Sequence, residues 1–82
     1  MKMTIQNIIS SELKKLMKDN RISTKALSNL SGVSFDIVSK IIGAKSLPEL
    51  ENVEKLCNVF KMSVCQFFDI VINDIFVKQN IA

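Results

Sequence analysis

The 82-residue sequence predicts an all-α fold, a compact bundle of five helices. Its apolar residues, 48% of the chain, recur at three- and four-residue steps, which is the periodicity of helices and not the alternation of strands. Only two Gly and one Pro are present, so few positions interrupt a helix. A chain of this length buries one modest core. We therefore expect one helical domain.

The first predicted helix covers about residues 4–19 and ends at Asn20-Arg21. Its lysines face away from the apolar residues, and we expect them to form a solvated face. The apolar stripe is made of Ile5, Ile8, Ile9, Leu13, Leu16 and Met17.

Two short helices joined by a tight turn are predicted next. Ser23 is a good cap for the first of them, because its hydroxyl accepts a backbone N–H one turn into the helix. Gly32 closes that helix in the left-handed conformation, which costs glycine little. Val33 is the apolar residue of the turn, and Ser34 caps the following helix. A chain bent in this way lays one short helix across another.

The two helices of this pair have distinct inner and outer faces. The inner residues are Ala26, Leu27 and Leu30 of the first helix and Val38 and Ile41 of the second, with Ile37 and Ile42 on its flanks. The outer residues of the second helix are Phe35, Asp36, Ser39 and Lys40. This arrangement presents the outer edge of the second helix as a helix is presented to a DNA major groove.

Residues 43–46 interrupt the helical spacing of apolar residues, and a fourth helix is predicted after them. Pro48 fits the first turn of that helix, where its missing N–H loses nothing. The apolar stripe then consists of Leu50, Val53, Leu56, Cys57 and Phe60. Ser63 is expected to cap a fifth helix beginning at Val64.

The C-terminal segment has more apolar residues than the core of a five-helix domain needs. We predict a domain over residues 1–69, completed by Val64 and Phe67 or Phe68, and an extension over residues 70–82. A monomer seldom exposes such a patch, so the extension is expected to join two subunits about a twofold axis. The alternative is that it folds back onto the first helix and Met3. The residues concerned are Ile70, Val71, Ile72, Ile75, Phe76 and Val77.

The net charge of +3 is unevenly distributed. Residues 1–45 carry eight Lys or Arg and three acids, a balance of +5. Residues 46–82 carry three Lys and five acids, a balance of −2. A basic half that contains the helix pair is typical of a surface that faces phosphates.

Several classes of function are excluded by composition. The chain has no His, so Cys57 and Cys65 make neither a four-ligand zinc site nor a Cys-His nucleophile, and we expect both to be reduced core thiols. No Gly-rich phosphate loop or acid-base constellation is present, so we expect no enzyme, no metal and no cofactor. No apolar run reaches the length of a signal peptide core or a membrane span. We expect a cytoplasmic protein.

From about Ile8 to Phe68 the sequence resembles the phage-repressor/Cro-type helix-turn-helix family, also called the xenobiotic-response-element family, whose fold is lambda-repressor-like. The residues that carry the resemblance are Ile22-Ser23, Ala26-Leu27, Ser31-Gly32-Val33-Ser34, Val38-Ser39-Lys40-Ile41, Lys45, Pro48, Val64 and Phe67-Phe68.

The resemblance implies the site residues. In this family the third helix reads base edges, which points to Phe35, Asp36 and Lys40, with Ser39 at the margin. Phosphate contacts fall at the start of the second helix and after the third, which points to Ser23, Thr24, Lys25, Lys45 and Ser46. The sequence departs from the family where Thr24 replaces a phosphate-binding Gln, where Phe35 and Asp36 replace amides, and where Gly43-Ala44 replaces Arg-Gly or Asn-Gly.

The combined prediction is a regulator of transcription, a repressor that binds double-stranded DNA as a homodimer. The alternative is a protein-interaction module on the same fold, such as an antirepressor or an antitoxin-like partner, in which Phe35 contacts protein.

Overall fold

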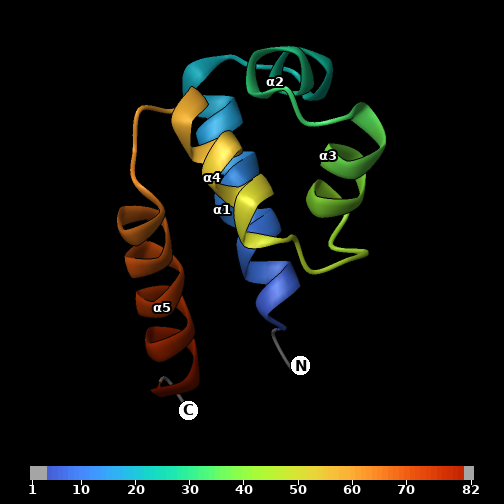
Figure 1. Ribbon diagram of the computed structural model, residues 1–82. Coiled ribbons are helices and arrows are strands. Elements are labelled where there is room, and N and C mark those ends of the chain that lie inside the picture. Colours follow the sequence, from blue (N-terminus) through green and yellow to red (C-terminus); the bar gives the residue numbers. More distant parts are fainter. Residues whose placement is uncertain (1–3, 81–82) are drawn as a thin grey trace.

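The computed structural model describes the backbone of residues 4–80 and the side chains of residues 4–74. The predicted all-α fold is confirmed, with helices α1 (Ile5–Asn20), α2 (Thr24–Ser31), α3 (Phe35–Ile42), α4 (Leu50–Val59) and α5 (Val64–Asn80). In Figure 1, α3 and α5 lie on opposite flanks with α1 and α4 between them, and α2 lies across one end. α1 packs against α3 and α5, while α4 packs against α2 and α5.

The core receives side chains from all five helices and from the turn after α2. Val38 and Ile41 of α3 are buried, which confirms their predicted inward positions, and Val33 of the turn is buried with them. Each buried aliphatic or aromatic side chain stabilises the fold by roughly 1.5–3 kcal/mol. The buried apolar residues are Ile8, Ile9, Leu13, Leu27, Val33, Val38, Ile41, Val53, Leu56, Cys57, Phe67 and Val71.

The hydroxyl caps predicted at Ser23, Ser34 and Ser63 are confirmed. The Ser23 and Ser34 hydroxyls accept the backbone N–H three residues on, at 3.1 Å and 3.3 Å. Ser63 and Gln66 form a reciprocal pair: the Ser63 hydroxyl accepts the Gln66 N–H at 3.1 Å, and the Ser63 N–H donates to the Gln66 side chain at 2.9 Å. These bonds satisfy donors that a helix start leaves unpaired.

Two predictions about the second and fourth helices are wrong. α4 begins at Leu50 with Glu49 as its cap, so Pro48 precedes the helix instead of forming its first turn. The extended backbone of Glu49, with ψ 148°, separates the proline from the first helical residue. Leu30 and Leu50 lie at the edges of their apolar stripes and are each 65% exposed.

The inward face of α5 differs from the prediction in two respects. Phe67 and Val71 are buried four residues apart, so Cys65 lies on another face and is exposed, while Cys57 of α4 is buried as predicted. The core also extends past residue 69, because Val71 is only 2% exposed. α5 continues through this point as one helix.

Within residues 4–80, no single helix has both the length and the hydropathy to cross a membrane. The segments Leu50–Val59 and Val64–Asp74 together reach that length and composition, but they are bent by 101° at the break between them.

Candidate nucleic-acid interface

The turn between α2 and α3 is held by backbone geometry and by two serines of α2. Gly32 adopts the left-handed conformation, with φ +79°, as predicted, and its N–H donates to the Ser28 carbonyl at 3.0 Å. The Ser28 hydroxyl donates to the Val33 carbonyl at 2.6 Å, and the Ser31 hydroxyl accepts the Val33 N–H at 3.1 Å. Both polar groups of Val33 are therefore paired, and the angle between the helices is fixed.

Helix α3 is anchored on one side and open on the other. Its buried side chains, Val38 and Ile41, face the core, and the Ser34 hydroxyl caps its start. The residues predicted to contact bases lie on the remaining surface: Phe35, Asp36 and Lys40 are exposed, and Ser39 is half-buried at the margin.

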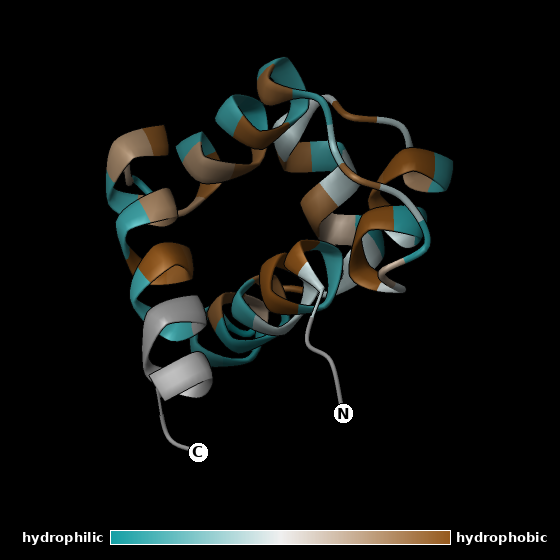
Figure 2. Cartoon of the chain, turned by 90° about the horizontal axis from the view of Figure 1, so that it is seen from below, coloured by the Kyte–Doolittle hydropathy of each residue, from teal (hydrophilic) through white to brown (hydrophobic). Residues whose placement is uncertain are grey.

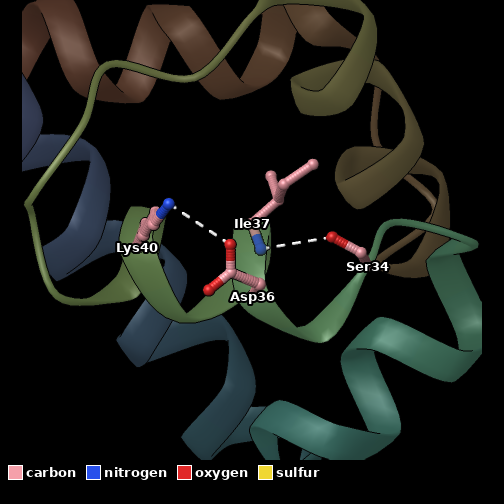
Figure 3. Close-up of polar contacts among 4 residues, drawn as sticks. All are labelled: Ser34, Asp36, Ile37 and Lys40. Carbon is pink, nitrogen blue, oxygen red and sulfur yellow. Dashed lines mark hydrogen bonds and ion pairs between the residues drawn. The ribbon is translucent and has the colours of Figure 1, made fainter.

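Two of these outward residues pair with each other. The Lys40 ammonium lies 3.2 Å from the Asp36 carboxylate, one turn earlier on α3 (Figure 3). Both side chains are largely exposed, so the pair adds only about 0.3–0.5 kcal/mol to stability. Asp36 also lies in the first turn and Lys40 in the last, which suits the helix dipole. The outward face of α3 thus carries one charge of each sign.

The far end of α3 is fixed by a residue that sequence reasoning missed. Three of the last four backbone carbonyls of α3 accept hydrogen bonds from the N–H groups of Gly43, Ala44 and Lys45. The fourth, that of Ile42, accepts the hydroxyl hydrogen bond of Ser10, which is buried in α1. A single serine in the apolar stripe of α1 gives no sequence signal for this role. The Ser10 hydrogen bond joins α1 to the end of the candidate recognition helix, α3.

The loop after α3 has a left-handed backbone at one of the positions where the sequence departs from the family pattern. Ala44 has φ +56°, the left-handed region that glycine adopts at least cost. This is the position at which the resembling family carries Gly. Gly43 has an ordinary φ of −80°, but a Cβ there would lie 3.2 Å from the Ser39 carbonyl oxygen. The backbone conformation therefore constrains the residue at position 44, and the space beside the Ser39 carbonyl constrains the residue at position 43.

The residues predicted to contact phosphates lie at two places, the start of α2 and the loop after α3. Lys25 is exposed on α2, beside the half-buried Thr24 and the cap residue Ser23. Lys45 and Ser46 are exposed in the loop. Backbone N–H groups at the start of α2 add anion-binding capacity to the first place.

The residues predicted to dimerise have different environments. Val71 belongs to the core, Ile70 is half-buried, and Ile72 is 59% exposed. The structure does not describe the side chains of Ile75, Phe76 and Val77, so their predicted role lies outside the described residues. Within residues 4–74, no three His, Cys, Asp or Glu side chains gather into a group that would hold a metal ion.

Comparison with known families gives a match over residues 12–74. The matching span contains the whole of α2, the turn, α3 and α4, together with parts of α1 and α5. Comparison with curated proteins and with solved structures gave no match. Because the match covers most of the chain and includes the helix pair described above, the protein belongs to the family of Cro/C1-type helix-turn-helix DNA-binding domains.

Proposed function

We propose that the protein is a cytoplasmic transcriptional repressor that binds double-stranded DNA as a dimer, with α3 in the major groove. The observation that carries this proposal is the way α3 is held. The Val33 hydrogen bonds fix its start, Val38 and Ile41 anchor its side, and Ser10 fixes its end. A helix that is already ordered loses little conformational freedom on binding.

Each outward residue has a base chemistry that it suits. The Lys40 ammonium donates to the guanine O6 and N7 acceptors, and the Asp36 carboxylate accepts from a cytosine amino group. Phe35 makes apolar contact with a thymine methyl group. Lys25 and Lys45 position the domain on the phosphates without reading sequence. No catalytic activity and no cofactor form part of this proposal.

A gel shift with DNA from around the protein's own gene tests the proposal. Lys45→Ala should weaken binding to all sequences by similar factors. Lys55→Ala is the matched control, since Lys55 is an exposed lysine of α4 that pairs with Glu51 at 3.6 Å. Phe35→Ala should reduce the preference for the best site by about 1–3 kcal/mol. Failure of the parent protein to bind any of this DNA would reject the proposal.

A second candidate function is a protein-interaction module on the same fold, such as an antirepressor or an antitoxin-like partner. It is favoured by two large apolar side chains on α3, because Phe35 is 54% exposed and Ile37 is 39% exposed. Asp36 also offsets the charge of Lys40 on that face. If Phe35→Ala abolishes capture of a protein partner and leaves DNA binding intact, this second function takes precedence.

A further inference from the structure

Helix α3 carries two charged side chains, and these form one ion pair. The Lys40 ammonium lies 3.2 Å from the Asp36 carboxylate, which is one turn earlier on the helix. The other residues of α3 are apolar apart from Ser39. Figure 2, in which α3 lies on the right, shows a largely hydrophobic helix (brown) interrupted by hydrophilic residues (teal). The pair is therefore the main source of hydrogen-bonding groups on the surface that meets DNA in the proposed function.

Both members of the pair are accessible to a ligand. The Asp36 side chain is 76% exposed and the Lys40 side chain is 55% exposed. Their backbone is fixed, because the Ser34 hydroxyl caps the start of α3 (Figure 3) and the Lys40 carbonyl accepts the Lys45 N–H at 2.9 Å. A carboxylate has a second oxygen and an ammonium has three N–H donors, so each group can still bind a ligand after the pair has formed. The pair thus presents an acceptor and a donor side by side.

Base pairs differ in the order of the polar groups along their major-groove edges. A C·G pair presents, from cytosine to guanine, one donor (N4) followed by two acceptors (O6 and N7). The N4 and O6 groups are joined by a Watson–Crick hydrogen bond, so they lie about 2.9 Å apart. The charged groups of Asp36 and Lys40 are separated by a similar distance, 3.2 Å. An acceptor and a donor held in this way match the N4 and O6 groups of one C·G pair.

The other base pairs fit this ion pair less well. An A·T pair also has a donor beside an acceptor, the adenine N6 and the thymine O4. The adenine N7 acceptor, however, then lies on the carboxylate side and repels it, while the thymine methyl group lies beyond O4, where the ammonium finds no second acceptor. A G·C pair in the opposite orientation presents its groups in the reverse order. C·G alone offers a donor to the carboxylate and two acceptors to the ammonium.

We propose that Asp36 and Lys40 act as one unit that reads a single C·G base pair. The Asp36 carboxylate accepts from the cytosine N4 amino group, and the Lys40 ammonium donates to the guanine O6 and N7. This inference rests on the proposed function. It adds that both contacts fall on the same base pair and that the order of the two residues along α3 fixes which strand carries the cytosine.

The ion pair also accounts for an acid at a position where the resembling family carries an amide. An amide side chain supplies an acceptor and a donor by itself and suits the N6 and N7 groups of adenine. In this chain, Asp36 and Lys40 divide the two roles. The ammonium beside the carboxylate offsets part of the repulsion from the DNA phosphates, which an unpaired acid in the groove would meet in full.

The first test removes each member of the pair. Competition gel shifts with each base pair of the best half-site replaced in turn should reveal one C·G pair that contributes about 5- to 150-fold to affinity. Asp36→Ala and Lys40→Ala should each remove most of the preference at that pair and leave the preferences elsewhere unchanged. Alanine is needed at position 36, because asparagine retains an oxygen that accepts from cytosine. Glu51→Ala and Lys55→Ala, which break the corresponding pair of α4, are the matched controls.

A modified base tests the Lys40 contact separately. Replacing the guanine of this pair with 7-deazaguanine removes the N7 acceptor and leaves O6 in place. The change should weaken binding of the parent protein and have no effect on Lys40→Ala. Equal weakening of both proteins would show that another group binds N7 and would overturn the assignment of Lys40.

The second test exchanges the two residues. The double variant Asp36→Lys with Lys40→Asp keeps both charges one turn apart but reverses the order of acceptor and donor along α3. Its preference at this position should change from C·G to G·C, and thermal unfolding checks that the domain stays folded. A folded double variant that keeps the preference of the parent overturns the proposal. Loss of preference at two different base pairs in the two alanine variants overturns it as well.

The outcomes separate this inference from the proposed function. A parent protein that binds DNA with a sequence preference, but at no C·G pair that depends on both residues, overturns the inference and leaves the function in place. A parent protein that binds no DNA overturns both.

Discussion

The Asp36 carboxylate lies 3.2 Å from the Lys40 ammonium on the face that we propose meets DNA. In a complex, the phosphates repel this carboxylate while they attract the lysine beside it. Asp36→Asn should therefore raise affinity for DNA of any sequence, and should raise it most at low salt, where the repulsion is least screened. Gel shifts over a range of salt concentrations measure both effects.

The control for this prediction is Glu51→Gln, which frees Lys55 from an equivalent pair on α4. It should leave DNA binding unchanged, because α4 lies away from the outward face of α3. A loss of affinity for the best site on Asp36→Asn would contradict the repulsion argument and would indicate that the carboxylate accepts from a cytosine.

The two thiols should differ in reactivity. Burial raises the pKa of the Cys57 thiol to about 11, whereas Cys65 is exposed near the start of α5. At pH 8 only about one thousandth of Cys57 is thiolate, the reactive form. One thiol per chain should therefore react quickly with a disulfide reagent in the native protein, and the second only on unfolding. Equal rates for both thiols would show that Cys57 is not buried in solution.

At the scale of the elements, the Ser10 hydroxyl links α1 to the last carbonyl of α3. Ser10→Ala should leave that carbonyl unpaired and cost about 1–3 kcal/mol of stability. It should also reduce the preference for the best DNA site over other sequences, because the end of α3 is less firmly held. Thermal unfolding and competition gel shifts measure the two effects. Ser11→Ala, at the exposed neighbouring position, is the control and should behave like the parent protein.

Substitutions at Gly32 test whether the turn after α2 needs a left-handed backbone at this position. A Cβ at this position would meet no heavy atom within 4 Å, so the cost of a substitution comes from the left-handed backbone alone. Gly32→Val should destabilise the domain by about 1–2 kcal/mol, and Gly32→Asn by less, since Asn adopts this conformation more readily. Thermal denaturation of the three proteins checks the order. Identical unfolding temperatures would contradict the assignment of Gly32 as the cap of α2.

The helices and their ends were predictable because their signals are local. A serine followed by a helical pattern predicts a cap, and a glycine after such a pattern predicts a left-handed end, whatever the rest of the chain does. The exposure of Leu30, Leu50 and Cys65 was not predictable in this way. Periodicity identifies the apolar side of a helix, but only the packing of neighbouring helices decides how much of that side is covered.

The candidate site was predictable in part. The outward positions on α3 followed from the inward positions of Val38 and Ile41, which the structure confirms. The hydrogen bonds of Ser10 and Ser28 were not predictable, because each depends on where a carbonyl of another segment comes to lie. Such contacts belong to the tertiary structure and leave no pattern in the sequence.

At the scale of the whole molecule, the uneven charge of the sequence becomes an uneven charge of the fold. Residues 1–45, with a balance of +5, include α1, α2 and α3, while residues 46–82, with a balance of −2, include α4 and α5. The basic part therefore contains α3 on one flank, and the acidic part contains α5 on the opposite flank. Such a distribution orients the protein toward a polyanion before contact is made.

The salt dependence of DNA binding measures how many of these charges meet phosphates. Lys25, Lys40 and Lys45 are exposed, and a dimer presents each of them twice. For about six contacts, the plot of log K against log salt should have a slope near −5, since each neutralised phosphate contributes about −0.9. Fluorescence anisotropy between low and physiological salt gives this slope directly.

The same measurement on a shorter DNA tests the proposed dimer. On a half-site that binds one subunit, only about three contacts are available, so the slope should be near −3. The parent protein on the full palindrome should keep the steeper value, because both subunits stay bound together. Equal slopes on the half-site and on the palindrome would mean that a single subunit accounts for all phosphate contacts. A slope near zero with binding intact would remove α3 from the groove altogether, because a helix flanked by Lys25 and Lys45 cannot enter it without displacing counterions.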